Sequence, residues 1–100
     1  MPGALRNRTQ NMLIDFLRAE IDIAHTFLQT AEIDSATDVH DSRVAHAKAR
    51  KALATVRHLL SRVRDPATSA EIKLRADELR IAIQVQERNS SRDDKIFQRH

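Results

Sequence analysis

The sequence predicts an all-α fold, specifically a three-helix antiparallel bundle, from three observations. One glycine and two prolines in 100 residues leave few positions at which the backbone can turn sharply. The hairpin turns and the β-branched or aromatic runs that a sheet would need are absent from the sequence. Charge is also sorted: residues 15–41 hold seven acids and one base, whereas residues 42–64 hold seven bases and no acid. We therefore expect one domain, residues 1–100, in which an acidic helix lies antiparallel on a basic helix.

The first helix is expected at about residues 9–32, with Thr9 or Asn11 as its N-cap. At about 100° per residue, one broad apolar arc comprises Met12, Leu13, Phe16, Leu17, Ile23, Ala24, Phe27, Leu28 and Ala31. Ile14 and Ile21 widen this arc on one flank, beyond what a contact with one helix needs. The first helix should therefore contact two neighbours.

The second helix is expected at about residues 42–63, after a loop at residues 33–41 that is rich in Asp, Ser and Thr. Asp38, Asp41 and Ser42 are the candidate N-caps. Apolar residues recur in steps of three and four, which predicts a narrow buried stripe of Ala45, Ala49, Ala52, Val56, Leu59, Leu60 and Val63. The opposite side is expected to be polar, with Arg43, His46, Arg50, Arg57 and Ser61.

The third helix is expected at about residues 69–88, because Pro66 cannot continue the second helix and pushes Asp65 out of the helical region. Thr68 and Glu71 have the spacing of a capping box. This helix carries two apolar stripes on nearly opposite sides: Ile72, Ala76, Leu79 and Ile83 on one, and Leu74, Ile81 and Val85 on the other. A terminal helix needs only the first stripe. The polar residues 89–100 are expected to form a flexible tail.

Composition argues against several function classes. The sequence has no cysteine, so we expect no disulfide framework, no thiolate nucleophile and no zinc-finger ligand set. We also expect no cofactor. No apolar run is long enough to span a membrane, and no secretory signal is recognisable, which favours a cytoplasmic protein. The only glycine is Gly3, so no glycine-rich loop exists to bind phosphate. We expect no catalytic residues and hence no enzyme.

Histidine and carboxylate residues give no complete metal site. Asp22 and His25 lie one helical turn apart, but di-iron bundles need such a pair from each of two helices and two further Glu residues. Asp38, His40 and Asp41 are too few and too close in sequence to form a full ligand set alone. We therefore expect no metal site.

Glu20 lies within the apolar arc of the first helix. Its carboxylate is either a half-buried cation-binding group or, as we expect, a rim residue paired with Lys48 or Arg50 of the second helix.

Ala49, Ala52, Val56 and Leu59, followed by Asp65 and Pro66 at a helix stop, resemble the second helix of a tetratricopeptide repeat. The first helix then resembles the first helix of the repeat, with Phe27, Leu28 and Ala31 as its packing ridge, and the third helix resembles a capping helix. This resemblance implies a tetratricopeptide-like hairpin plus a third helix, and an interaction module that binds a protein or peptide.

These patterns together predict a non-catalytic protein–protein interaction module. Its expected partner is a second copy of the chain, as a homodimer, or an unidentified protein. The expected contact residues are Leu74, Ile81 and Val85, or Ile14 and Ile21 on the first helix. The alternative is binding of nucleic acid or another polyanion by the basic second helix, through Arg43, Arg50, Lys51 and Arg57.

Overall fold

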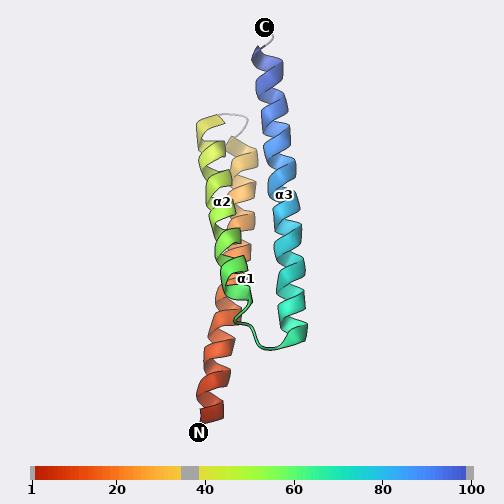
Figure 1. The fold of residues 1–100 in the computed structure, drawn as a ribbon. Coiled ribbons are helices and arrows are strands. Elements are labelled where there is room, and N and C mark those ends of the chain that lie inside the picture. Colours follow the sequence, from red (N-terminus) through yellow and green to blue (C-terminus); the bar gives the residue numbers. More distant parts are fainter. Residues whose placement is uncertain (1, 35–38, 99–100) are drawn as a thin grey trace.

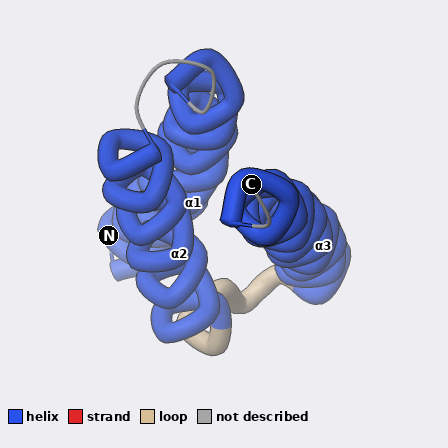
Figure 2. Tube along the Cα trace, turned by 90° about the horizontal axis from the view of Figure 1, so that it is seen from above, coloured by secondary structure: helices blue, strands red, loops and turns tan. Residues whose placement is uncertain are grey.

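Three helices run up, down and up along one long axis in the computed structural model, which describes residues 2–34 and 39–98 (Figure 1). They are α1 (Pro2–Asp34), α2 (Val39–Leu60) and α3 (Pro66–Gln98). Viewed from above, α3 stands beside the α1–α2 pair, and each helix contacts the other two (Figure 2). The molecule measures 68 × 19 × 16 Å. The predicted all-α three-helix antiparallel bundle is therefore confirmed.

The two long helices extend further than the sequence patterns indicated. α1 begins at Pro2 rather than near residue 9, so Thr9 and Asn11 lie inside the helix and do not cap it. Proline is favoured in the first helical turn because its missing N–H has no partner there in any case. α3 continues to Gln98, so the prediction of a flexible tail from residue 89 was wrong. Asn89 and the serines after it cost a helix only tenths of a kcal/mol each, and neither glycine nor proline follows to break it.

The second helix starts and ends about three residues earlier than expected, at Val39 and Leu60. Ser42 therefore lies one turn inside α2 and is buried, so it is not the N-cap. Of the predicted loop at residues 33–41, only residues 35–38 lie between the helices; they, and the candidate cap Asp38 among them, are outside the described residues. After Leu60, two tighter hydrogen bonds of the i→i−3 type end the helix, with Arg62 N and Val63 N as donors.

Asp65, and not Thr68, caps the third helix. Its Oδ2 accepts hydrogen bonds from Thr68 N at 3.0 Å and from Thr68 Oγ1 at 2.6 Å, with Pro66 as the first helical residue. These two bonds favour the charged carboxylate and lower the pKa of Asp65. Glu71 does not reach back to the cap as a capping box requires, because its carboxylate binds Arg18 of α1 instead.

Gln10 fixes the α2–α3 linker to α1. Its Nε2 donates to the carbonyl oxygen of Arg62 at 2.9 Å, and its Oε1 accepts from Arg64 N at 3.0 Å. One side-chain amide thus satisfies two backbone groups that helix termination would leave unpaired. Beyond this point the N-terminal part of α1 continues past the linker, while the C-terminal part of α3 extends beyond the other end of the α1–α2 pair (Figure 1).

The core lies where the three helices meet. Alanines 45, 49 and 52 are buried, as predicted, and small side chains there allow the axes of α1 and α2 to approach closely. All four residues of the predicted inner stripe of α3 are buried. The buried cluster comprises Leu17, Ile21, Ala24, Leu28, Ala49, Ala52, Leu53, Val56, Val63, Ile72, Ala76, Leu79 and Ile83.

Among the described side chains, ion pairs join α3 to both of its neighbours. They are Arg18–Glu71 (3.1 Å) and Arg75–Asp22 (2.9 Å) with α1, and Arg50–Glu87 (3.3 Å) and Arg57–Asp77 (3.8 Å) with α2. The predicted antiparallel contact of α1 with α2 is present, but Arg50 and Arg57 pair with acids of α3 rather than of α1. Because the pairs are solvent-exposed, each contributes about 0–1 kcal/mol to stability. Their main effect is to fix the position of α3 on α1 and α2.

Candidate interaction surface

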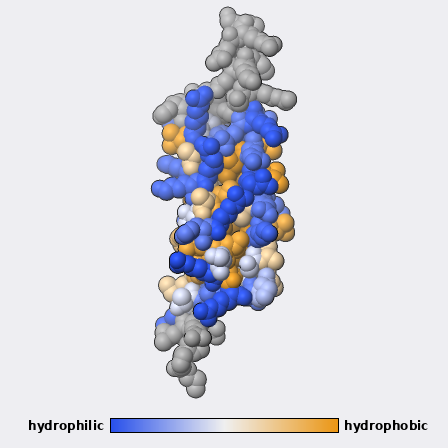
Figure 3. Space-filling model, viewed as in Figure 1, coloured by the Kyte–Doolittle hydropathy of each residue, from blue (hydrophilic) through white to orange (hydrophobic). Residues whose placement is uncertain are grey.

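The outer face of α3 carries three large aliphatic side chains exposed to solvent. Leu74, Ile81 and Val85 are 60%, 52% and 49% exposed. At 100° per residue they fall on one side of the helix, opposite the stripe that packs on α1 and α2. Hydrophobic atoms accordingly lie along the outer edge of α3 in the space-filling view (Figure 3). The structure thus places these three predicted residues together on one straight, accessible surface.

The other predicted contact residues, on α1, are buried or partly buried. Ile21 is 0% exposed and belongs to the core, and Ile14 is partly buried and packs against that core. α1 contacts both α2 and α3, and it therefore buries the flank that holds Ile21. Ile14 and Ile21 are therefore packing residues rather than surface contacts.

A second exposed apolar stripe lies on α1 and was not recognised from the sequence. Met12, Phe16 and Ile23 belong to the predicted apolar arc of the first helix, yet they are 68%, 44% and 45% exposed. Next to them, Phe27 is half-buried and the Lys48 ammonium lies 5.6 Å from its ring centroid. Part of this α1 stripe is therefore already covered by a side chain from α2.

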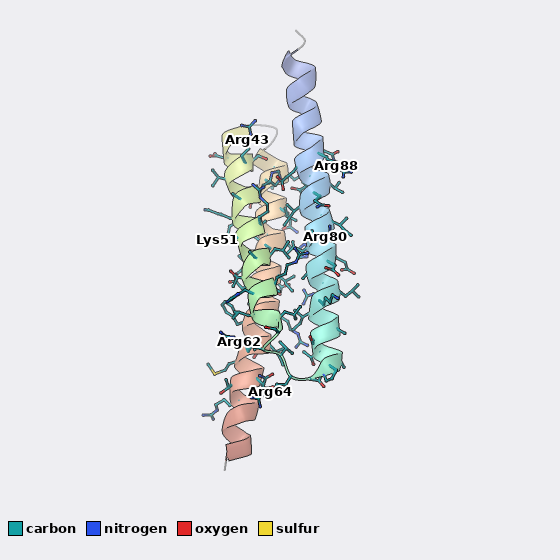
Figure 4. The ribbon with its side chains drawn as sticks, in the orientation of Figure 1. Arg43, Lys51, Arg62, Arg64, Arg80 and Arg88 are labelled. Atoms are coloured by element: carbon teal, nitrogen blue, oxygen red, sulfur yellow. The ribbon has the colours of Figure 1, made fainter. Side chains whose placement is uncertain are left out.

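Three of the four bases of the alternative polyanion site, Arg43, Arg50 and Arg57, follow at seven-residue spacing and share one side of α2, whereas Lys51 lies away from that side. Arg50 and Arg57 are committed to Glu87 and Asp77 of α3, and Arg43 also has an interaction within the chain. Lys51 is exposed, and Arg43 and Lys51 lie two turns apart along α2 (Figure 4). The carboxylates of α3 thus neutralise part of the charge that α2 presents.

An open groove of about 630 Å³ runs between α2 and α3. Its floor is apolar, with Leu53, Ala54 and Ile83, and its sides carry Arg50, Arg57 and Arg80 among other residues. Arg80 belongs to the side of α3 that faces α2 (Figure 4). Figure 3 shows the hydrophobic atoms between the two helices with hydrophilic side chains at the margins. The groove holds guanidinium groups, but two of the three already bind carboxylates.

Glu20 is partly buried. Its expected partners make other contacts: Arg50 binds Glu87, and Lys48 lies over the ring of Phe27.

Two polar residues are buried in α2, contrary to expectation. His46 was placed on the polar side but is only 5% exposed, and its Nε2 donates to Gln86 Oε1 of α3 at 3.0 Å. Ser42, one turn earlier, is fully buried, and its Oγ has no hydrogen-bond partner among the described residues. His46 therefore lies at the contact between α2 and α3. Neither side chain is accessible to a substrate.

The described residues contain no group of three or more His, Cys, Asp or Glu side chains arranged to bind a metal ion. Asp22 binds Arg75, and His25 is exposed. Asp38 and the side chain of His40 lie outside the described residues. Within the same described part, none of the helices has an apolar stretch that could cross a bilayer.

Comparisons with protein-family models, with curated proteins and with solved structures find no match for this chain. The resemblance to a tetratricopeptide repeat therefore rests on the spacing of a few residues alone. α1 by itself has 33 residues, whereas one complete two-helix repeat has about 34. The α1–α2 hairpin is thus much longer than one such unit, and we carry no peptide groove over from that family.

Proposed function

We propose that this chain is a non-catalytic protein–protein interaction module of the cytoplasm that associates with a second copy of itself through the outer face of α3. The observation that supports this most is the exposure of Leu74, Ile81 and Val85 in one line on a rigid helix. Isolated exposed aliphatic residues are common on proteins, but an aligned group on one helix face is typical of a contact surface.

The energetics favour covering this face. Removing apolar surface from water contributes about 25 cal/mol per Å². The backbone that carries these three side chains is already helical in the protomer. The conformational entropy lost on association is therefore mainly that of the side-chain rotamers. A second copy offers an identical apolar surface, and a twofold axis places the two against each other.

Equilibrium sedimentation of the wild type and of Ile81→Glu tests the proposal. We expect the wild type to dimerise as its concentration rises, and Ile81→Glu to stay monomeric with unchanged helical circular dichroism. Ile23→Glu on α1 is the matched control, because Ile23 is similarly exposed and receives the same substitution. A wild type that stays monomeric at millimolar concentration, or a loss of dimer in Ile23→Glu but not in Ile81→Glu, would refute the assignment.

Polyanion binding through α2 is the second candidate, supported by the arginine-lined groove. It predicts that affinity for a labelled oligonucleotide falls steeply between 50 and 200 mM salt, by about tenfold for a few phosphate contacts. It also predicts that Arg50→Gln with Arg57→Gln weakens binding more than Lys73→Gln with Arg88→Gln, which removes the same charge from α3. Equal losses in the two double variants would indicate nonspecific attraction only.

A further inference from the structure

We propose that two copies of this chain pack α3 against α3 in antiparallel orientation, with Leu74 of each copy facing Val85 of the other and Glu71 facing Arg88. The inference rests on the proposed self-association and specifies the orientation and register of the two α3 helices. It follows from the order of side chains on the outer face of α3.

Charge along this face is asymmetric. Helical spacing places Glu71, Leu74, Glu78, Ile81, Val85 and Arg88 within about 60° of the centre of the face. The acids lie toward its N-terminal end, and the base lies at its C-terminal end. A parallel pair would set Glu71 against Glu71, Glu78 against Glu78 and Arg88 against Arg88. An antiparallel pair sets the acidic end of one copy against the basic end of the other, which is the complementary arrangement.

One antiparallel register covers all three aliphatic side chains. When residue i faces residue 159 − i, Leu74 meets Val85 and Ile81 meets the aliphatic stem of Glu78. Sliding one turn so that Leu74 meets Ile81 reduces the offset of the two Glu78 residues along the axis from about 4.5 Å to about 1.5 Å, which increases their repulsion. Sliding the other way so that Ile81 meets Val85 leaves Leu74 opposite residue 92, beyond the apolar segment. Charge and apolar coverage thus favour the same register.

The structure leaves room for this packing. α3 stands at one side of the α1–α2 pair, so its outer face points away from both other helices (Figure 2). Glu71 binds Arg18, yet its side chain is 51% exposed, and a carboxylate accepts several hydrogen bonds. Residues 71–88 span about 25 Å of helix. A contact of that length falls below about 1,200 Å² in total, so we expect a weak, concentration-dependent dimer.

Charge exchange between two variants tests the pairing of Glu71 with Arg88. Glu71→Arg alone brings two bases together at both ends of the dimer, and Arg88→Glu alone brings two acids together. Each variant should dimerise about tenfold more weakly than the wild type at low salt. Mixing them restores an opposite-charge pair at both ends, so the mixture should dimerise as well as the wild type. A mixture as weak as its components would overturn the pairing.

Disulfide trapping tests the orientation, because the chain has no cysteine of its own. In the proposed register, Leu74→Cys and Val85→Cys each fail to crosslink alone, since identical positions lie about 16 Å apart along the axis. Mixed together under mild oxidation, the two variants should form a heterodimeric disulfide. Crosslinking of each variant by itself would show a parallel dimer and overturn this inference, while leaving the proposed self-association intact. A wild type that stays monomeric in sedimentation would overturn both the antiparallel geometry and the proposed self-association.

Discussion

Truncating the two faces of α3 by the same chemical change should give very different losses of stability. Leu79 is 0% exposed among the side chains of α1 and α2, whereas Leu74, on the same helix, is 60% exposed. Leu79→Ala and Leu74→Ala remove the same three carbon atoms and bring the same helix propensity. Any difference between the two variants therefore reports how much each side chain is buried.

The expected magnitudes follow from these exposures. A fully buried leucine replaced by alanine leaves a cavity, and such changes cost about 2–5 kcal/mol. For Leu74→Ala, we expect a loss of stability of about 1 kcal/mol. This value takes about 0.8 kcal/mol per buried methylene for the covered part of the side chain. The higher helix propensity of alanine offsets about 0.2 kcal/mol of this. For a domain of this size, the Leu79 variant should melt at least about 8 °C lower.

Urea and thermal unfolding followed by circular dichroism measure both variants. The measurements belong at low micromolar concentration, where a weak dimer dissociates and Leu74 reports on the protomer alone. Comparable losses in the two variants would refute the separation of α3 into an inner and an outer face. A melting temperature of the wild type that rises with concentration, and no longer does so in Leu74→Ala, would support the outer face as the contact.

Three further changes test the packing. Ala49→Leu should lower stability by about 1–3 kcal/mol, because it overpacks the α1–α2 contact. The control Ala47→Leu, on the exposed side of α2, should change stability by no more than about 0.5 kcal/mol. Equal effects of the two substitutions in urea unfolding would contradict the alanine contact. Ser42→Ala should raise stability by about 1 kcal/mol, because it removes a buried hydroxyl that lacks a partner among the described residues; a loss of that size would show that the hydroxyl is satisfied. Asp65 should stabilise the fold above its ordinary pKa of 3.8, and this contribution should disappear as the pH falls through its lowered folded-state pKa. Thermal melts of Asp65→Asn at pH 7 and pH 3 should accordingly show a smaller pH effect than the wild type, and an identical pH effect would argue against the cap.

The apolar periodicity predicted the fold class, the alanine contact and both faces of α3, because each depends on spacings that persist over several turns. It failed where one helix contacts two neighbours. α1 buries the flank with Ile21 and exposes Phe16, although both residues are apolar and lie near the same arc. Sequence alone does not fix which part of a broad apolar arc faces inward, since that depends on where the third helix docks.

Residue type misled the sequence interpretation at His46, which was assigned to the solvent because histidine is polar. Its position, one turn before Arg50 and one turn after Ser42, lies on the flank of α2 that meets α3. There Gln86 supplies the hydrogen bond that burial of an imidazole requires. Spacing from Leu53, which is buried on the same flank, is the signal that would have indicated this. The helix ends were missed for a related reason: capping residues mark possible starts, and an uninterrupted backbone can continue through them.

The composition of the outer face of α3 is itself an argument for contact. At solvent-exposed helical positions Glu, Lys and Gln stabilise a helix better than isoleucine or valine, which lose rotamer freedom against the preceding turn. Ile81 and Val85 therefore cost helix stability at positions where about half of each side chain stays exposed to solvent. The α1 stripe differs at its Ile23 end, which lies one turn before Phe27, over whose ring Lys48 already lies. In the proposed dimer, burial of these side chains against a second copy would offset that cost.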